Sequence, residues 1–162
     1  MWCVALFMLL YIEKVHLKYN KSILFLIYVG GKERVYIEKN LNPSGKKTSD
    51  CAIRAVAAAT DQSWDKVYMD LANTGFQLKK EMSDVDTVDK YLTSLGFITG
   101  KIKVAKGQHR PTVEGFARNN PDKVAVLRVA NHLTCCAYGN YVDIWDCGDC
   151  SVYKYWYKEL RR

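Results

Sequence analysis

The stretch at residues 49–60, SDCAIRAVAAAT, places a cysteine at the start of a run of small, helix-forming residues. Ser49 or Asp50 can cap a helix here, because a short side-chain oxygen accepts a hydrogen bond from an otherwise unpaired backbone N–H. Cys51 then lies in the first turn, where unpaired N–H groups and the helix dipole stabilise a thiolate, and Arg54 adds positive charge one turn later. The pattern indicates a nucleophilic thiol; the alternative is that Cys51 is a small buried residue facing a sheet.

A cysteine nucleophile also needs a base and a group that orients the base. Of the three histidines in the chain, His132 is the one placed at the start of a predicted strand. The chain then turns at Gly139 and Asn140 and returns to Asp146, level with His132, which favours Asp146 as the orienting carboxylate. A three-residue loop or a bulge at this turn would place Asp146 directly opposite His132, whereas a strict two-residue turn would put Asp143 on the His132 face. The non-catalytic alternative is a histidine bonded to a backbone carbonyl.

Hydrophobic periodicity and capping residues predict the elements that must position these side chains. We predict helices over residues 50–60, 63–75, 83–96 and 112–118. Residues 123–146 are rich in β-branched and aromatic residues on both sides of a Gly-Asn turn, which predicts strands and a hairpin, and SVYKYWY supplies one more strand. Residues 36–50 are polar and predict a loop. The expected fold is α+β, with N-terminal helices packed on a C-terminal antiparallel β-sheet.

The composition is that of an ordinary globular chain, with 162 residues of which 49% are apolar and 25% are charged. This length suits one domain with a single hydrophobic core. The net charge is +7, but the first 50 residues carry eight Lys and Arg against four acidic residues, so the remainder is only mildly basic. Because no dense basic cluster is interleaved with aromatic residues, we do not expect a nucleic-acid partner.

The first 36 residues contain two apolar runs, MWCVALFMLL and SILFLIYVGG. Both are too short to span a bilayer, and the first lacks the basic residues and cleavage site of a secretion signal. We therefore expect no membrane association and a cytoplasmic protein with reduced thiols. Residues 1–36 are interpreted as an N-terminal extension or hairpin and residues 37–162 as the main domain. The pattern favours no particular oligomeric state.

Four stretches carry a resemblance to a known family: NPSGKKTSDCAIRAVAAATDQSWDKVY, YLTSLGF, TVEGFARNNP and NHLTCCAYGNYVDIWD. Together they resemble small phage and bacterial proteins with a papain-like cysteine-peptidase fold, related in outline to the C39-like peptidases. The match covers roughly residues 38–157. The resemblance implies a papain-like domain over residues 37–162, acting on a protein or peptide in the cytoplasm of a bacterium or a phage-infected host cell, without a cofactor.

The same resemblance implies individual roles. Cys51 is the nucleophile, His132 the general base and Asp146 the orienting acid, while Arg54 is structural. Papain-like enzymes usually carry a glutamine ahead of the nucleophile as an oxyanion donor, and this sequence has none between residues 36 and 51. Asn42, nine residues before the cysteine, is the nearest substitute.

The remaining cysteines support a rival interpretation. Cys147 and Cys150 are separated by two residues, and Cys135 and Cys136 lie on the preceding strand, so four sulfurs could bind zinc. Neighbouring strand residues point to opposite faces, so the adjacent pair could join only on a distorted strand. These cysteines could instead form a redox disulfide or remain incidental free thiols, and we assign no metal. A catalytically inactive module that binds a host protein or nucleic acid is the alternative to an enzyme.

Four aromatic residues could line a substrate cleft, although their spacing is more typical of a core. They are Trp64, Tyr68, Trp145 and Trp156.

Overall fold

The computed structural model describes residues 35–160, which belong to one compact unit of the chain, Val35–Arg162. The predicted N-terminal extension or hairpin falls almost wholly outside the described residues. In chain order the elements are β1 (Tyr36–Glu38), α3 (Cys51–Thr60), α4 (Trp64–Leu78), α5 (Val85–Ser94), β2 (Ile98–Lys101), α6 (Val113–Asn119), β3 (Lys123–Val129), β4 (His132–Ala137), β5 (Asn140–Asp143) and β6 (Lys154–Glu159).

The six strands form one sheet in the order β1-β5-β4-β3-β6-β2. The α+β class is confirmed, but the expectation of an antiparallel sheet is wrong at one edge, because β1 runs parallel to β5. The sequence does not predict β1 or β2, which have three and four residues and are held by partners far along the chain. The remaining four strands pair antiparallel, as expected.

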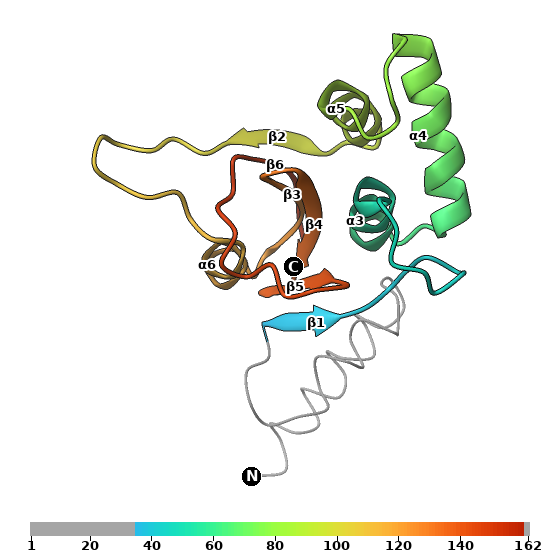
Figure 1. The fold of residues 1–162 in the computed structure, drawn as a ribbon. Helices are drawn as coiled ribbons and strands as arrows, with labels where there is room; N and C mark the ends of the chain where they lie inside the picture. The colour runs from blue at the N-terminus through green and yellow to red at the C-terminus, as the bar shows by residue number, and fades with distance from the viewer. Residues whose placement is uncertain (1–34, 161–162) are drawn as a thin grey trace, which may run out of the picture. The chain divides into compact units, whose positions relative to one another are not determined.

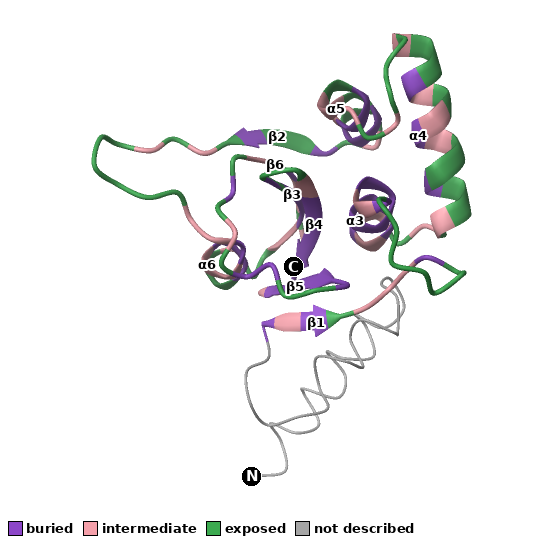
Figure 2. Cartoon of the chain, in the orientation of Figure 1, coloured by how far each residue is buried: buried purple, intermediate pink, exposed green. Residues whose placement is uncertain are grey.

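Helices cover both faces of the sheet (Figure 1). Helix α3 packs against β4 on one face, with α4 outside it, and α5 lies on the same side against α4 and β2. Helix α6 lies on the other face. Because α3 consists largely of alanine and other small residues, its backbone can approach the sheet closely, and Figure 2 shows it buried along most of its length. This packing fixes the N-terminus of α3, and with it Cys51, against the start of β4. Its buried residues are Ala52, Ile53, Arg54, Ala55, Val56, Ala57 and Ala59.

Local signals set most helix boundaries. Ser63 caps α4 by accepting a hydrogen bond from Lys66, and Thr112 caps α6. Helix α5 is capped by Asp84 and begins at Val85, within the predicted range 83–96. Helix α4 continues past residue 75, its predicted end, and ends at Leu78. Among the described residues, no helix is both long and apolar enough to cross a membrane.

The hairpin between β4 and β5 sets the register of the candidate site. Ala137 pairs with Asn140, so the two turn residues are Tyr138 and Gly139, with φ values of 54° and 78°. Positive φ at both positions is typical of the type I′ turn that suits the twist of a hairpin. The expected turn at Gly139 and Asn140 is therefore wrong by one residue. Further along the hairpin Cys135 pairs with Val142, so the next residue of β5, Asp143, shares a face with alternate residues of β4 that lead to His132.

Candidate active site

Cys51 is the first residue of α3 and is half-buried. Burial raises the pKa of its thiol, but hydrogen bonds from His132 and from the backbone N–H groups of Leu133 and Ala52 outweigh this, so the pKa is lowered. The residue before it, Asp50, is the N-cap but makes no side-chain capping bond to the helix. The positive end of α3 is therefore open to another anion, as the sequence predicts for a thiolate.

His132 lies at the start of β4, and its Nε2 atom is 2.7 Å from Oδ2 of Asp143. Burial lowers the pKa of His132, but hydrogen bonds with Asp143, Cys147 and Cys51 outweigh this and raise the pKa to about 11. Burial likewise raises the pKa of Asp143, and the hydrogen bond and the charge of His132 reverse that effect and lower it. The pair therefore favours an imidazolium beside a carboxylate, with the second imidazole nitrogen left for the thiol.

Asp143 is held firmly in this position. It is 6% exposed, and its other carboxylate oxygen, Oδ1, accepts a hydrogen bond of 2.7 Å from the backbone N–H of Ile144. A carboxylate that accepts bonds on both oxygens has little freedom to rotate. It therefore orients the imidazole, which is the role that the sequence gives preferentially to Asp146.

Asp146 itself lies elsewhere, so the preference for it is corrected. Its side chain is exposed and accepts hydrogen bonds from the hydroxyl of Tyr141 and, at 3.0 Å, from the backbone N–H of Gly148. The physical reason is the tight turn at Tyr138 and Gly139: the hairpin needs no bulge, and β5 ends at Asp143 before the chain can bring Asp146 opposite the histidine.

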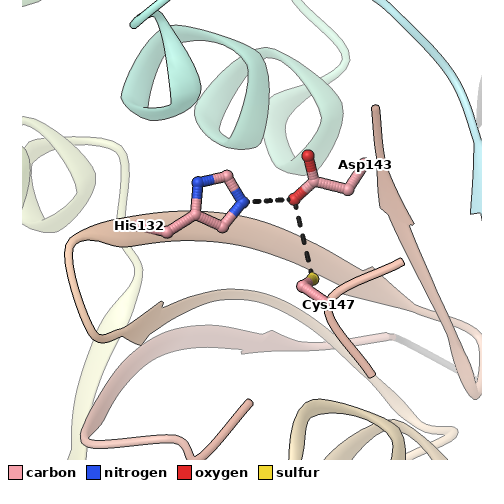
Figure 3. A group of neighbouring side chains, drawn as sticks. All are labelled: His132, Asp143 and Cys147. Carbon is pink, nitrogen blue, oxygen red and sulfur yellow. Dashed lines mark hydrogen bonds and ion pairs between the residues drawn. The ribbon is translucent and has the colours of Figure 1, made fainter. Parts of the chain in front are cut away.

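Cys147 is a member of this cluster that the sequence does not assign to it. It is 1% exposed, and its Sγ atom lies 3.7 Å from Oδ2 of Asp143, the same oxygen that bonds His132. Figure 3 shows the carboxylate between the imidazole and the sulfur. The available signal was the spacing of four residues from Asp143, which lets a single turn after β5 bring the thiol back.

The proposed group of four cysteines does not assemble. Cys135 packs in the core cluster on the α3 side of the sheet and Cys136 in the cluster on the α6 side, as alternation along a strand requires. Burial raises the pKa of both thiols, that of Cys136 to about 12. Cys147 and Cys150 are also free thiols rather than a disulfide.

Asn42, the oxyanion candidate, is hydrogen-bonded to Asp50, the residue before Cys51. Its Nδ2 atom donates to Oδ2 of Asp50 at 2.9 Å, and its Oδ1 atom accepts from the backbone N–H and the hydroxyl of Ser44. Asp50 also accepts a bond of 2.8 Å from the indole N–H of Trp64 and forms a buried ion pair with Arg54. These contacts support a structural role for both Asn42 and Arg54, since they fix the entry to α3.

Of the four aromatic candidates, Trp145 lies closest to this chemistry. Its ring centroid is 5.2 Å from that of His132, and 44% of its surface is exposed. Trp156, in contrast, is fully buried in the core. Trp64 stacks on Tyr68 above Asp50. Trp145 therefore offers an apolar surface to a molecule that approaches the histidine.

Compared with known proteins, the chain matches no family model, no curated protein and no solved structure.

Proposed function

We propose that the protein is a cysteine-dependent hydrolase of peptide, isopeptide or similar acyl bonds, with a papain-like arrangement of its groups. The observation that carries the proposal is the coupling of a helix N-terminal thiol of lowered pKa, Cys51, to a histidine that a buried carboxylate, Asp143, holds at 2.7 Å. Nucleophile, base and orienting acid come from α3, β4 and β5, and each has the partner that its role requires.

In the proposed reaction, the Cys51 thiolate attacks the carbonyl carbon of the substrate. Backbone N–H groups at the start of α3 hold the oxyanion that forms. His132, protonated beside Asp143, gives its proton to the leaving amine as the carbon–nitrogen bond breaks, leaving a thioester. His132 then accepts a proton from water, which attacks the thioester, and the acid product and the Cys51 thiolate are released.

The contact between Trp145 and His132 supports an apolar or aromatic side chain in the substrate next to the scissile bond. The five described cysteines are free thiols, which supports action in a reducing compartment such as the cytoplasm.

Alkylation by iodoacetamide at pH 6 tests the nucleophile. We expect Cys51 to react on the order of tenfold faster than Cys150, whose pKa is raised by burial, because only a thiolate reacts at this pH. The variant His132→Gln is expected to remove the difference. Equal rates at Cys51 and Cys150 in the wild-type protein would contradict the proposal.

Turnover is tested separately with a fluorescently labelled unfolded protein and an epoxysuccinyl inhibitor of cysteine peptidases. Cleavage by the wild-type protein, its loss in Cys51→Ala and one covalent adduct on Cys51 are the expected results. An inactive binding module predicts neither cleavage nor an adduct.

A further inference from the structure

Three side chains around the β4–β5 hairpin bring together ligand atoms of three different kinds. An imidazole nitrogen of His132, a carboxylate oxygen of Asp143 and the sulfur of Cys147 all lie within 4.8 Å of one another. Asp143 and Cys147 are buried, and His132 is half-buried, so the atoms face one another in the interior rather than the solvent (Figure 3). The mechanism proposed above uses the first two residues and gives no task to the third.

The distances suit a small tetrahedral ion. Zinc binds histidine nitrogen and carboxylate oxygen at about 2.0–2.2 Å and thiolate sulfur at about 2.3 Å, so neighbouring ligand atoms stand roughly 3.3–3.7 Å apart. The separation of 3.7 Å between Cys147 Sγ and Asp143 Oδ2 already has this value. The separation of 2.7 Å between His132 Nε2 and Asp143 Oδ2 is that of a hydrogen bond and has to open by about 0.6 Å for the ion to enter between the two atoms.

We propose that His132 Nε2, Asp143 Oδ2 and Cys147 Sγ bind one Zn²⁺ ion, with the fourth position open to water. The carboxylate and the thiolate together balance the charge of the ion, which favours a divalent metal in a buried site. A set with one thiolate and one imidazole favours zinc over magnesium or calcium, which prefer oxygen ligands. Binding releases the thiol proton of Cys147 and the Nε2 proton of the imidazolium.

Occupation of this site excludes the hydrolase chemistry, and this part of the inference rests on the proposed function. The ion takes the Oδ2 and Nε2 atoms that now bond each other at 2.7 Å, so Asp143 no longer orients His132. As a metal ligand, His132 is no longer free to act as the acid and base of the proposed reaction. Zinc is therefore a reversible inhibitor that binds beside the nucleophile without using it as a ligand.

The binding test uses the full chain, stripped with a chelator and titrated with Co²⁺ in place of zinc. A single thiolate ligand gives a charge-transfer absorption in the near ultraviolet, with an intensity that reports the number of sulfurs on the metal. We expect one equivalent of Co²⁺ to bind with one sulfur, and one equivalent of Zn²⁺ to displace it. Cys147→Ser should lose the charge-transfer band and bind zinc at least about tenfold more weakly. The matched control, Cys150→Ser, should behave as the wild type.

Several results would overturn the metal site. They are an absence of stoichiometric metal binding, an unchanged band in Cys147→Ser, or loss of the band in Cys150→Ser, which would place the ion on the Cys147–Cys150 pair. A circular dichroism spectrum and thermal melt verify that each variant is folded, and His132→Gln supplies a second ligand variant if Cys147→Ser does not fold.

Alkylation of Cys51 at pH 6 with and without zinc tests the inhibition. We expect zinc to slow the alkylation in the wild type but not in Cys147→Ser. Metal binding without any effect on Cys51 would refute the inhibition and leave the site, whereas a slow Cys51 in the metal-free protein would refute the hydrolase alone.

Discussion

Replacement of Asp143 by asparagine and by alanine isolates the carboxylate from the rest of the site. Asparagine has nearly the same shape, but it carries no charge and has a single acceptor oxygen. That oxygen can accept from His132 while the backbone N–H of Ile144 loses its acceptor, because the two bonds use different oxygens of Asp143. Alanine removes the acceptor as well. Asp146→Asn is the matched control, because that carboxylate bonds Tyr141 and Gly148 and not the histidine.

The size of the effect follows from the 2.7 Å contact between His132 and Asp143. A hydrogen bond to a charged partner contributes about 1.5–3 kcal/mol and a neutral one about 0.5–1.5 kcal/mol. The asparagine variant should therefore destabilise the imidazolium form of His132 by about 1 kcal/mol, and the alanine variant by about the full 1.5–3 kcal/mol of a charged hydrogen bond. Because about 1.4 kcal/mol corresponds to one pH unit, the midpoint for formation of the Cys51 thiolate should rise by about one unit in the asparagine variant and by about one to two in the alanine variant.

The assay measures the rate of iodoacetamide alkylation at Cys51 between about pH 4 and pH 9, with the modified peptide quantified by mass spectrometry. The pH midpoint is a better readout than the rate, because a thiolate of higher pKa is also more nucleophilic and partly conceals the smaller thiolate fraction. The wild type and Asp146→Asn should share one midpoint, and the two Asp143 variants should lie above it in the order Asn, Ala. A midpoint that stays fixed in both Asp143 variants, or moves in Asp146→Asn instead, would refute the assignment of the orienting acid.

Three further changes test the scaffold. Arg54→Met leaves Asp50 buried without its ion-pair partner and should lower the free energy of unfolding in urea by about 3 kcal/mol; a change below about 1 kcal/mol would mean that the bonds from Asn42 and Trp64 suffice. Gly75→Ala improves helix propensity by about 1 kcal/mol, but the new Cβ would lie 2.6 Å from the carbonyl oxygen of Lys80. The variant should therefore be less stable than the wild type by about 1–3 kcal/mol in the same urea measurement, and a more stable variant would contradict this. The pKa of Asp143 is lowered in the folded state, so its carboxylate contributes stability above about pH 4 that is lost as the pH falls further. The difference in melting temperature between the wild type and Asp143→Asn should therefore shrink on acidification. A difference that persists at pH 2 would contradict the ion pair.

The sequence predicts the elements that have their own periodicity and misses those that depend on a distant partner. The helices and the strands β3–β6 follow from apolar spacing, capping residues and β-branched runs. Strand β1 is a three-residue segment whose pairing with β5 joins Tyr36 to Tyr141, across about a hundred residues of chain. No local signal specifies that contact, because it depends on the edge that β5 offers on the far side from β4.

The candidate site divides in the same way. The positions of Cys51 and His132 follow from local rules, since a helix start and a strand start can each be recognised from a few residues. The choice between Asp143 and Asp146 depends on the length of the hairpin loop. A two-residue turn puts Asp143 on the His132 face, whereas a three-residue loop or a bulge puts Asp146 opposite His132. The structure has a two-residue turn, Tyr138-Gly139, with a tyrosine at positive φ, which no local feature of the sequence indicates. The sequence does not predict that Cys147 joins the cluster, because the position of this residue depends on the path of the chain after β5.

One oxygen atom, Oδ2 of Asp143, connects the two activities inferred for this site. It accepts hydrogen bonds from the imidazole and from the Cys147 thiol at once, so an ion that binds there displaces the bond on which the Cys51 thiolate depends. Serine at position 147 can still donate to the carboxylate, whereas a neutral hydroxyl is a poor ligand for zinc. Cys147→Ser should therefore show the same rate of Cys51 alkylation with and without zinc, whereas zinc should slow alkylation in the wild type. A slowing of equal size in both proteins would mean that the inhibition does not depend on the Cys147 ligand.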